Sequence, residues 1–289
     1  MPNPPIPPAL AVVALGLLAS LGWGISDFGG GLTSRRAPFL GVLLGSQVAS
    51  LFVGVPILLL VSEPAMRPID VLLSIVGGLL GGTGLALLYR GLSVGRMGVV
   101  APIAAVLTAT IPVLFGFATQ GLPSMLAIVG IGAAALSVML VSRSPGSTEE
   151  GPSGLLYALG AGTLFGLFTI DAAQLDDALV LSPIILIRAA SIACVALLIL
   201  GLRQEWRVPR PLWPALLGVG VIDMSATGAY LLAIAIGPLS IAAILASLYP
   251  VVTTILAALV LRERVTPAHA AGILAAGVAV ALIAGASSV

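Results

Sequence analysis

The sequence predicts an all-α integral membrane protein in which ten transmembrane helices form two inverted five-helix repeats. Composition is the first observation: 59% of the 289 residues are hydrophobic and 8% are charged, whereas roughly 25% of residues are charged in a soluble domain. The second is a division of the chain into ten long apolar runs. The third is an internal repeat that relates the two halves. The formal net charge of +1 gives no indication of a nucleic-acid partner.

Ten apolar runs, bounded by charges, prolines or glycine clusters, predict helices. Each run is long enough to cross about 30 Å of hydrocarbon at a rise of about 1.5 Å per residue. The runs lack the two-residue alternation of a membrane β-barrel, so strands are excluded. In chain order the expected helices cover 9–31, 38–61, 70–91, 97–119, 123–142, 153–175, 181–202, 212–236, 239–261 and 268–286.

The arginines predict which side each loop faces, because basic residues accumulate on the cytoplasmic side of a membrane. Arg67 is alone on the side that includes both termini, and Arg188 lies inside the run 181–202. The opposite side holds the other ten arginines, namely Arg35, Arg36, Arg90, Arg96, Arg143, Arg203, Arg207, Arg210, Arg262 and Arg264. We therefore expect a multi-pass protein of the cytoplasmic (inner) membrane with both termini outside the cytoplasm.

An internal repeat becomes visible when the sequence is shifted by 142 residues without gaps. This offset places Trp23-Gly24 onto Phe165-Gly166 and Gly78 onto Gly220, and it aligns all ten runs. Each half then holds five helices, an odd number, so the second half is expected to be inverted relative to the first. Inverted halves around a midplane site are the architecture of alternating access. The predicted division is a first repeat over 1–142, a linker over 143–153 and a second repeat over 154–289.

Several short motifs resemble the EamA repeat of the drug/metabolite transporter superfamily. They are Leu21-Gly-Trp-Gly24, the glycines Gly95 and Gly237 before the fourth helix of each half, Ser247-Leu-Tyr-Pro250, and Leu261-Arg-Glu-Arg-Val-Thr266 followed by Gly272 and Gly277. The second half matches this pattern better. In the first half Gln120-Gly-Leu-Pro123 stands in place of the Arg-Glu-Arg motif, and Pro112 is displaced from the position that matches Pro250. The resemblance implies a carrier of amino acids, drugs or other small metabolites, and aromatic amino-acid exporters are among the members of similar size.

Polar and aromatic residues inside the apolar runs predict a solute pathway, because ionisable groups in a bilayer are costly unless paired or hydrated. Asp223 is the deepest, and Thr227 and Tyr230 share its helix face. As an isolated carboxylate, Asp223 is expected to bind a substrate amine or a coupling proton. Aromatic rings stack on flat or cationic ligands, and Pro250 interrupts backbone hydrogen bonding beside two further candidates. The predicted substrate-binding residues are Trp23, Phe165, Asp223, Thr227, Tyr230, Ser247 and Tyr249. The alternative is a polar network that packs helices.

Two acid–base pairs are predicted as gates that open alternately. Asp171 and Arg188 have similar estimated depths near the outer ends of their helices, and Asp27 and Arg90 lie near the inner ends. The alternative is that these charges extend to the lipid headgroups, above all Arg90.

The predicted function is a secondary transporter that moves small organic solutes by alternating access, in the export direction. The single Cys and single His exclude an internal disulfide and multi-His metal sites. The absence of a Walker loop excludes a nucleotide-driven pump on this chain. No catalytic residue, metal or cofactor is expected, and the partners are a small-molecule substrate and the lipid bilayer. Whether the protein is a monomer or homodimer stays open. The alternatives are a passive channel and, third, an intramembrane enzyme that would use Ser93 and His269.

Overall fold

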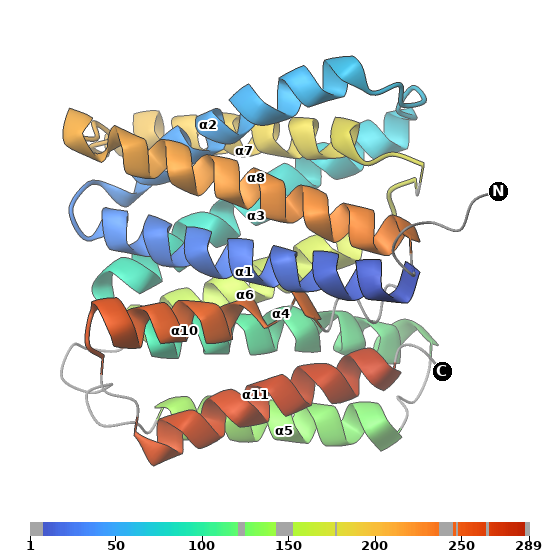
Figure 1. The fold of residues 1–289 in the computed structure, drawn as a ribbon, viewed down its shortest axis with the longest axis vertical. Coiled ribbons are helices and arrows are strands. Elements are labelled where there is room, and N and C mark those ends of the chain that lie inside the picture. The colour runs from blue at the N-terminus through green and yellow to red at the C-terminus, as the bar shows by residue number, and fades with distance from the viewer. Residues whose placement is uncertain are drawn as a thin grey trace.

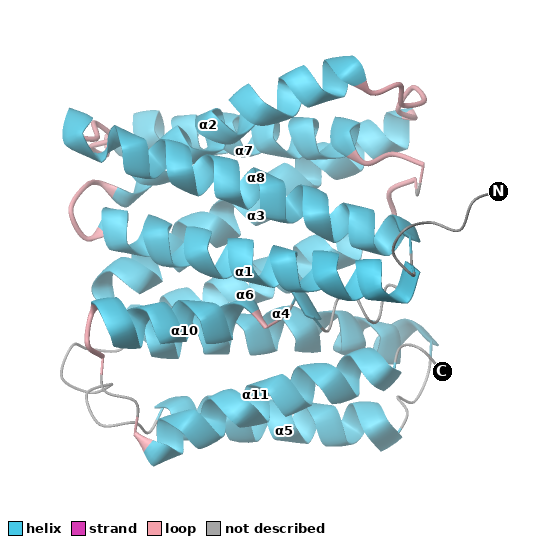
Figure 2. Ribbon diagram, in the orientation of Figure 1, coloured by secondary structure: helices cyan, strands magenta, loops and turns pink. Residues whose placement is uncertain are grey.

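The computed structural model is built of helices, as Figures 1 and 2 show. It describes residues 8–120, 125–142, 153–176, 178–236, 245–246, 248–263 and 266–286. The first half contains α1 (Pro8–Ser34), α2 (Phe39–Leu60), α3 (Pro68–Val94), α4 (Met97–Gln120) and α5 (Met125–Ser142). The second half contains α6 (Ser153–Ala172), α7 (Leu181–Leu202), the short η1 (Arg210–Leu212), α8 (Trp213–Ile236), α10 (Tyr249–Val260) and α11 (Pro267–Ala286).

The run expected to form a helix over 239–261 differs most from the prediction. Residues 245–246 are helical, Leu248 lies in a turn, and α10 begins at Tyr249 with Pro250 in its first turn. Proline fits there because the first turn of a helix does not use its N–H groups internally. The expected linker lies outside the described residues, apart from Ser153.

The described helices indicate a helical membrane protein. Six of them, α1, α2, α3, α6, α7 and α8, are long and apolar enough to cross a membrane. Large apolar side chains cover the outside of the bundle, including Phe52, Leu60 and Leu200, which are 74%, 86% and 74% exposed. Exposure on this scale fits lipid rather than water as the surrounding solvent.

The helices of the two halves are interleaved. α1 packs along α8 and α3 packs along α6, while α2 lies against α7 and α5 against α11. If the helices of the first half are matched in order with those of the second, α1 corresponds to α6 and α3 corresponds to α8. The contact between α1 and α8 then has the contact between α6 and α3 as its counterpart. The largest core cluster also joins both halves, since Phe28 and Leu88 belong to it together with Ala158 and Ala257.

Two glycines make equivalent close approaches in opposite halves, Gly220 against α2 and Gly78 against α7. A Cβ on Gly220 would lie 2.7 Å from the Cβ of Ala49, and one on Gly78 would lie 2.5 Å from the Cβ of Ala190. The Cβ on Gly220 would also clash with the carbonyl oxygen of Ser46 and the backbone nitrogen of Ser50 on α2. The Cβ on Gly78 would clash with the same two atoms of Ile187 and Ser191 on α7. The α7 positions follow their α2 counterparts by 141 residues, as 49 and 190 show. The two glycines are separated by the predicted offset of 142, so the spacing of 141 between these α2 and α7 positions differs from it by one residue.

Candidate functional site

A partly buried ion pair between Arg188 on α7 and Asp223 on α8 forms the centre of the candidate site. The Nη2 of Arg188 donates to Oδ2 of Asp223 and lies 3.4 Å from Oγ1 of Thr227. The two charged side chains are 13% and 20% exposed. Two charged groups that are largely shielded from water stabilise each other, because each serves as the counter-charge of the other.

Gln47 on α2 connects this pair to the first half of the chain. Its Oε1 accepts a hydrogen bond from Nη1 of Arg188 at 2.9 Å, and its Nε2 donates to Oγ of Ser191 at 3.1 Å. Gln47 and Ser191 are 3% and 1% exposed. Gln47 was not among the predicted site residues, although it is the only amide side chain in the predicted helix 38–61.

An aromatic group from three helices lies beside the ion pair. The Nε1 of Trp23 on α1 donates to Oγ1 of Thr227 at 3.3 Å. The ring of Trp23 lies 5.3 Å from that of Tyr230 on α8 and 6.5 Å from that of Tyr249 on α10, measured between centroids. The structure thus brings together Trp23, Thr227, Tyr230, Tyr249 and Asp223, five of the seven residues predicted to bind substrate.

Phe165, also predicted to bind substrate, lies elsewhere. Phe165 packs on α3, where its ring carbon Cε1 would be 2.9 Å from a Cβ on Gly84, and it borders the core cluster that contains Leu88. Ser247 lies outside the described residues.

The ion pairs predicted for the gates are not the ones that this structure contains. Arg188 pairs with Asp223, whereas Asp171 is buried against α3, with its Oδ2 2.9 Å from the position of a Cβ on Gly77. Within the described part of the chain, that Oδ2 has no hydrogen-bond partner. Depth along a helix suggested the pair, but the two side chains face different neighbours. Asp223 is correspondingly not the isolated carboxylate that we expected.

The second predicted gate, Asp27 with Arg90, is also not formed in this structure. Asp27 is 8% exposed and lies one helical turn after Trp23 on α1. The guanidinium of Arg90 instead lies 5.6 Å from the ring centroid of Phe39. Asp27 therefore belongs to the surroundings of the central site.

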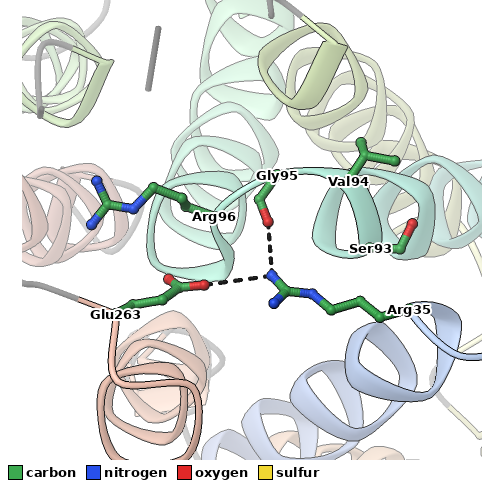
Figure 3. Close-up of a pocket in the computed structure, with 6 residues that line it drawn as sticks. All are labelled: Arg35, Ser93, Val94, Gly95, Arg96 and Glu263. Atoms are coloured by element: carbon green, nitrogen blue, oxygen red, sulfur yellow. Dashed lines mark hydrogen bonds and ion pairs between the residues drawn. The ribbon is translucent and has the colours of Figure 1, made fainter. Parts of the chain in front are cut away.

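At one end of the bundle Arg35 and Glu263 join the two halves of the chain (Figure 3). Their side chains approach to 3.5 Å, and Arg35 Nη2 also donates to the carbonyl oxygen of Gly95 at 2.9 Å. Glu263 accepts the backbone N–H groups of Met97 and Gly98 at 3.3 and 3.2 Å, which satisfies the first turn of α4. The cavity here is about 600 Å³ in volume and is lined by Arg35, Ser93, Val94, Gly95, Arg96 and Glu263.

The opposite end of the bundle, where α3 begins, carries a second connection between the halves. Glu63 accepts the backbone N–H groups of Val180, Leu181 and Ser182 at 3.2, 2.6 and 2.9 Å, at the start of α7. Partial burial raises the pKa of Glu63, but the hydrogen bonds from Leu181 and Ser182 outweigh it and leave the pKa below its ordinary value. An exposed ion pair of Arg67 and Asp176, at 3.6 Å, joins the two halves at the same end.

Comparison with known proteins addresses the second half directly. Residues 152–285 match the EamA-like transporter family. This range contains α6 to α10 and nearly all of α11, and with them Arg188, Asp223 and Tyr249. The resemblance predicted from the Ser247–Pro250 and Leu261–Thr266 motifs is therefore supported, and the family is one of transporters. A similarity to the aromatic amino-acid exporters in particular stays a prediction.

The fold extends beyond the family match. A solved structure described only as "Crystal structure of protein" shares 18% sequence identity with the chain at a TM-score of 0.62, over 95% of this chain and 98% of the other. At this identity the likeness shows a common fold. The search of curated proteins gives no match.

Proposed function

We propose that the protein is a secondary transporter that exports small organic solutes across the cytoplasmic membrane by alternating access. The observation that carries the proposal is the Arg188–Asp223 pair beside the aromatic group of Trp23, Tyr230 and Tyr249, because a polar site at depth in an apolar bundle marks a transport pathway. Both halves of the chain build this site. The family match over residues 152–285 supports the same function.

We propose further that residues 1–142 and 154–289 are two inverted repeats, joined by the linker 143–153. The exchange of the pairs α1–α8 and α6–α3 supports this division, as do the matched approaches at Gly78 and Gly220. Repeats of this kind exchange conformations around a fixed central site. Both termini would then lie on the same side, which we assign to the extracytoplasmic face from the arginine distribution.

The chemistry of the site favours a zwitterionic substrate, such as an amino acid with a flat side chain. A substrate carboxylate would take the place of Asp223 on Arg188, and its ammonium group would take the place of Arg188 on Asp223. Each buried charge keeps a counter-charge throughout this exchange, so the cost of an unpaired ion is avoided. The rings of Trp23 and Tyr230 supply a surface for the side chain of the substrate.

The gates in this proposal are the two end connections, Arg35–Glu263 and Arg67–Asp176. Each joins one half of the chain to the other, and they lie at opposite ends of α3. Alternating access requires that one connection opens while the other stays closed. Arg188, predicted as a gate, takes the role of a substrate-binding residue, while Asp27 lies between site and gate. A gating role for Arg90 and Asp171 would need a conformation in which they leave their present neighbours.

Three related probes test the charge requirement. L-Phenylalanine carries both charges, L-phenylalaninamide only the cation, and N-acetyl-L-phenylalanine only the anion. Replacing the exposed Trp206 and Trp213 by Phe leaves Trp23 as the sole tryptophan, whose fluorescence reports binding. We expect phenylalanine to bind more tightly than either single-charge probe, and Asp223→Asn to abolish its preference over N-acetyl-L-phenylalanine. Equal affinity for all three probes would overturn the zwitterion assignment.

Counterflow in proteoliposomes tests the transport mechanism. Vesicles loaded with unlabelled phenylalanine should accumulate labelled phenylalanine transiently, because a carrier couples entry to exit. Equilibration without transient accumulation would favour the passive channel instead. The Thr110→Val variant is a matched control, since this buried hydroxyl on α4 donates to the backbone carbonyl of Val106.

A further inference from the structure

We infer that Gln47 is a positioning residue that holds Arg188 in the binding site while the substrate carboxylate replaces Asp223. This inference rests on the proposed function and deepens it, because it names the group that makes Arg188 available to a substrate.

The orientation of the Gln47 amide is fixed at both ends. Its oxygen accepts from Nη1 of Arg188 at 2.9 Å and its nitrogen donates to Ser191 at 3.1 Å, one turn further along the same helix as Arg188. Burial of Gln47 at 3% exposure removes water as a competing partner. Both hydrogen bonds run from α2 to α7, so the amide joins the two halves.

The guanidinium of Arg188 divides its bonds between two tasks. Nη1 is bound to Gln47, whereas Nη2 faces Asp223 and Thr227. An incoming carboxylate therefore exchanges with Asp223 at Nη2 and leaves Nη1 undisturbed. Because an amide is neutral, Gln47 fixes the position of the guanidinium without neutralising it. A free arginine side chain would instead lose considerable rotamer entropy on each binding event.

The location of the contact suits a fixed point in the transport cycle. Gln47 and Arg188 are equivalent positions under the offset of 141 that relates Ala49 of α2 to Ala190 of α7. Equivalent residues of two inverted repeats that touch each other lie on the axis between the repeats. Exchange of the two conformations leaves such a contact in place. Arg188 is thus presented to the substrate from the same point in both states.

The test compares probes with and without a carboxylate. In the protein that retains only Trp23, Gln47→Met keeps the approximate length of the side chain and removes both hydrogen bonds. We expect about tenfold weaker binding of L-phenylalanine, the effect of losing one hydrogen bond to a charged group, and unchanged binding of L-phenylalaninamide. Ser191→Ala should produce a smaller change in the same direction, and the control Thr110→Val none, because the Thr110 hydroxyl on α4 donates to the backbone carbonyl of Val106. Equal weakening of both probes would show a general structural role and overturn the inference.

A second measurement needs no substrate. Phenylglyoxal modifies the guanidinium groups of arginines, and peptide mass spectrometry measures the rate at which it modifies Arg188. Gln47→Met should raise this rate several-fold, because one face of the guanidinium loses its partner. An unchanged rate at Arg188 overturns the inference. If the parent protein binds no phenylalanine while the rate does rise, the proposed substrate is wrong and the role of Gln47 stands.

Discussion

Asp223→Asn isolates the energetic role of the central ion pair, because it retains the shape of the side chain and removes its charge. Arg188 would keep Gln47 and Thr227 as partners but lose its only ionic one in the described part of the chain. The same change removes the group that we propose for binding a substrate amine.

The expected magnitude follows from the burial of the two side chains. Breaking a fully buried pair costs about 3–5 kcal/mol, and an exposed pair contributes about 0–1 kcal/mol. With the two side chains 13% and 20% exposed, and with neutral partners still bound to Arg188, we expect a loss of about 2–3 kcal/mol. This corresponds to a fall in unfolding temperature of roughly 4–8 °C. The double variant Asp223→Asn/Arg188→Gln buries no charge and should recover most of the loss.

Thermal unfolding of the purified variants in detergent micelles at neutral pH measures these differences. Asp176→Asn is the matched control, because its partner Arg67 is 52% exposed and water solvates both groups. The control should change the unfolding temperature little. The reasoning fails if Asp223→Asn is as stable as the parent, or if the two single effects simply add in the double variant.

Three further predictions concern the ends of the bundle and its orientation. The folded pKa of Glu63 lies below its ordinary value. The stability that this group contributes is therefore present above its unfolded pKa of about 4.3 and is lost as pH falls through the folded pKa. In thermal scans between about pH 3 and 7, the unfolding temperature of Glu63→Gln should fall less on acidification than that of the parent, and equal slopes contradict this. Glu263→Gln should loosen the end of the bundle near Ser93, so a Ser93→Cys probe in a purified Cys194→Ser protein should react faster with a water-soluble maleimide. An unchanged rate argues against a role of the Arg35–Glu263 contact in closing this end. A fluorescent protein fused to the C-terminus should stay dark, because it folds poorly outside the cytoplasm, whereas bright cells would show the opposite orientation.

The helices were predictable because each apolar run ends at residues that a bilayer excludes. The start of α3 illustrates this, since Arg67 and Asp70 lie at the boundary and Pro68 occupies the first turn. The turn at Leu248 was harder to predict, because Pro250 indicates a distortion of the helix without showing whether the helix bends or ends there. Register between the repeats depends on single-residue shifts, which a composition rich in Ala, Leu and Gly hides.

Most of the central site was also predictable, but its pairing was not. Asp223, Thr227 and Tyr230 share a helix face, which sequence spacing establishes directly. Estimated depth indicated Asp171 as the partner of Arg188, but depth says nothing about the direction in which a helix presents a side chain. Gln47 carries no charge and therefore did not attract attention, although a single amide in an otherwise apolar helix is itself a signal.

The two hydrogen bonds that Glu263 accepts from the start of α4 bear on the order in which the chain assembles. Residues 97 and 98 leave the ribosome long before residue 263, so the first turn of α4 waits for most of the chain before it gains its acceptor. α1 waits in the same way for α8. The five helices made first cannot complete their packing during synthesis, and a fragment that ends within the linker would expose surfaces that only the remaining helices cover.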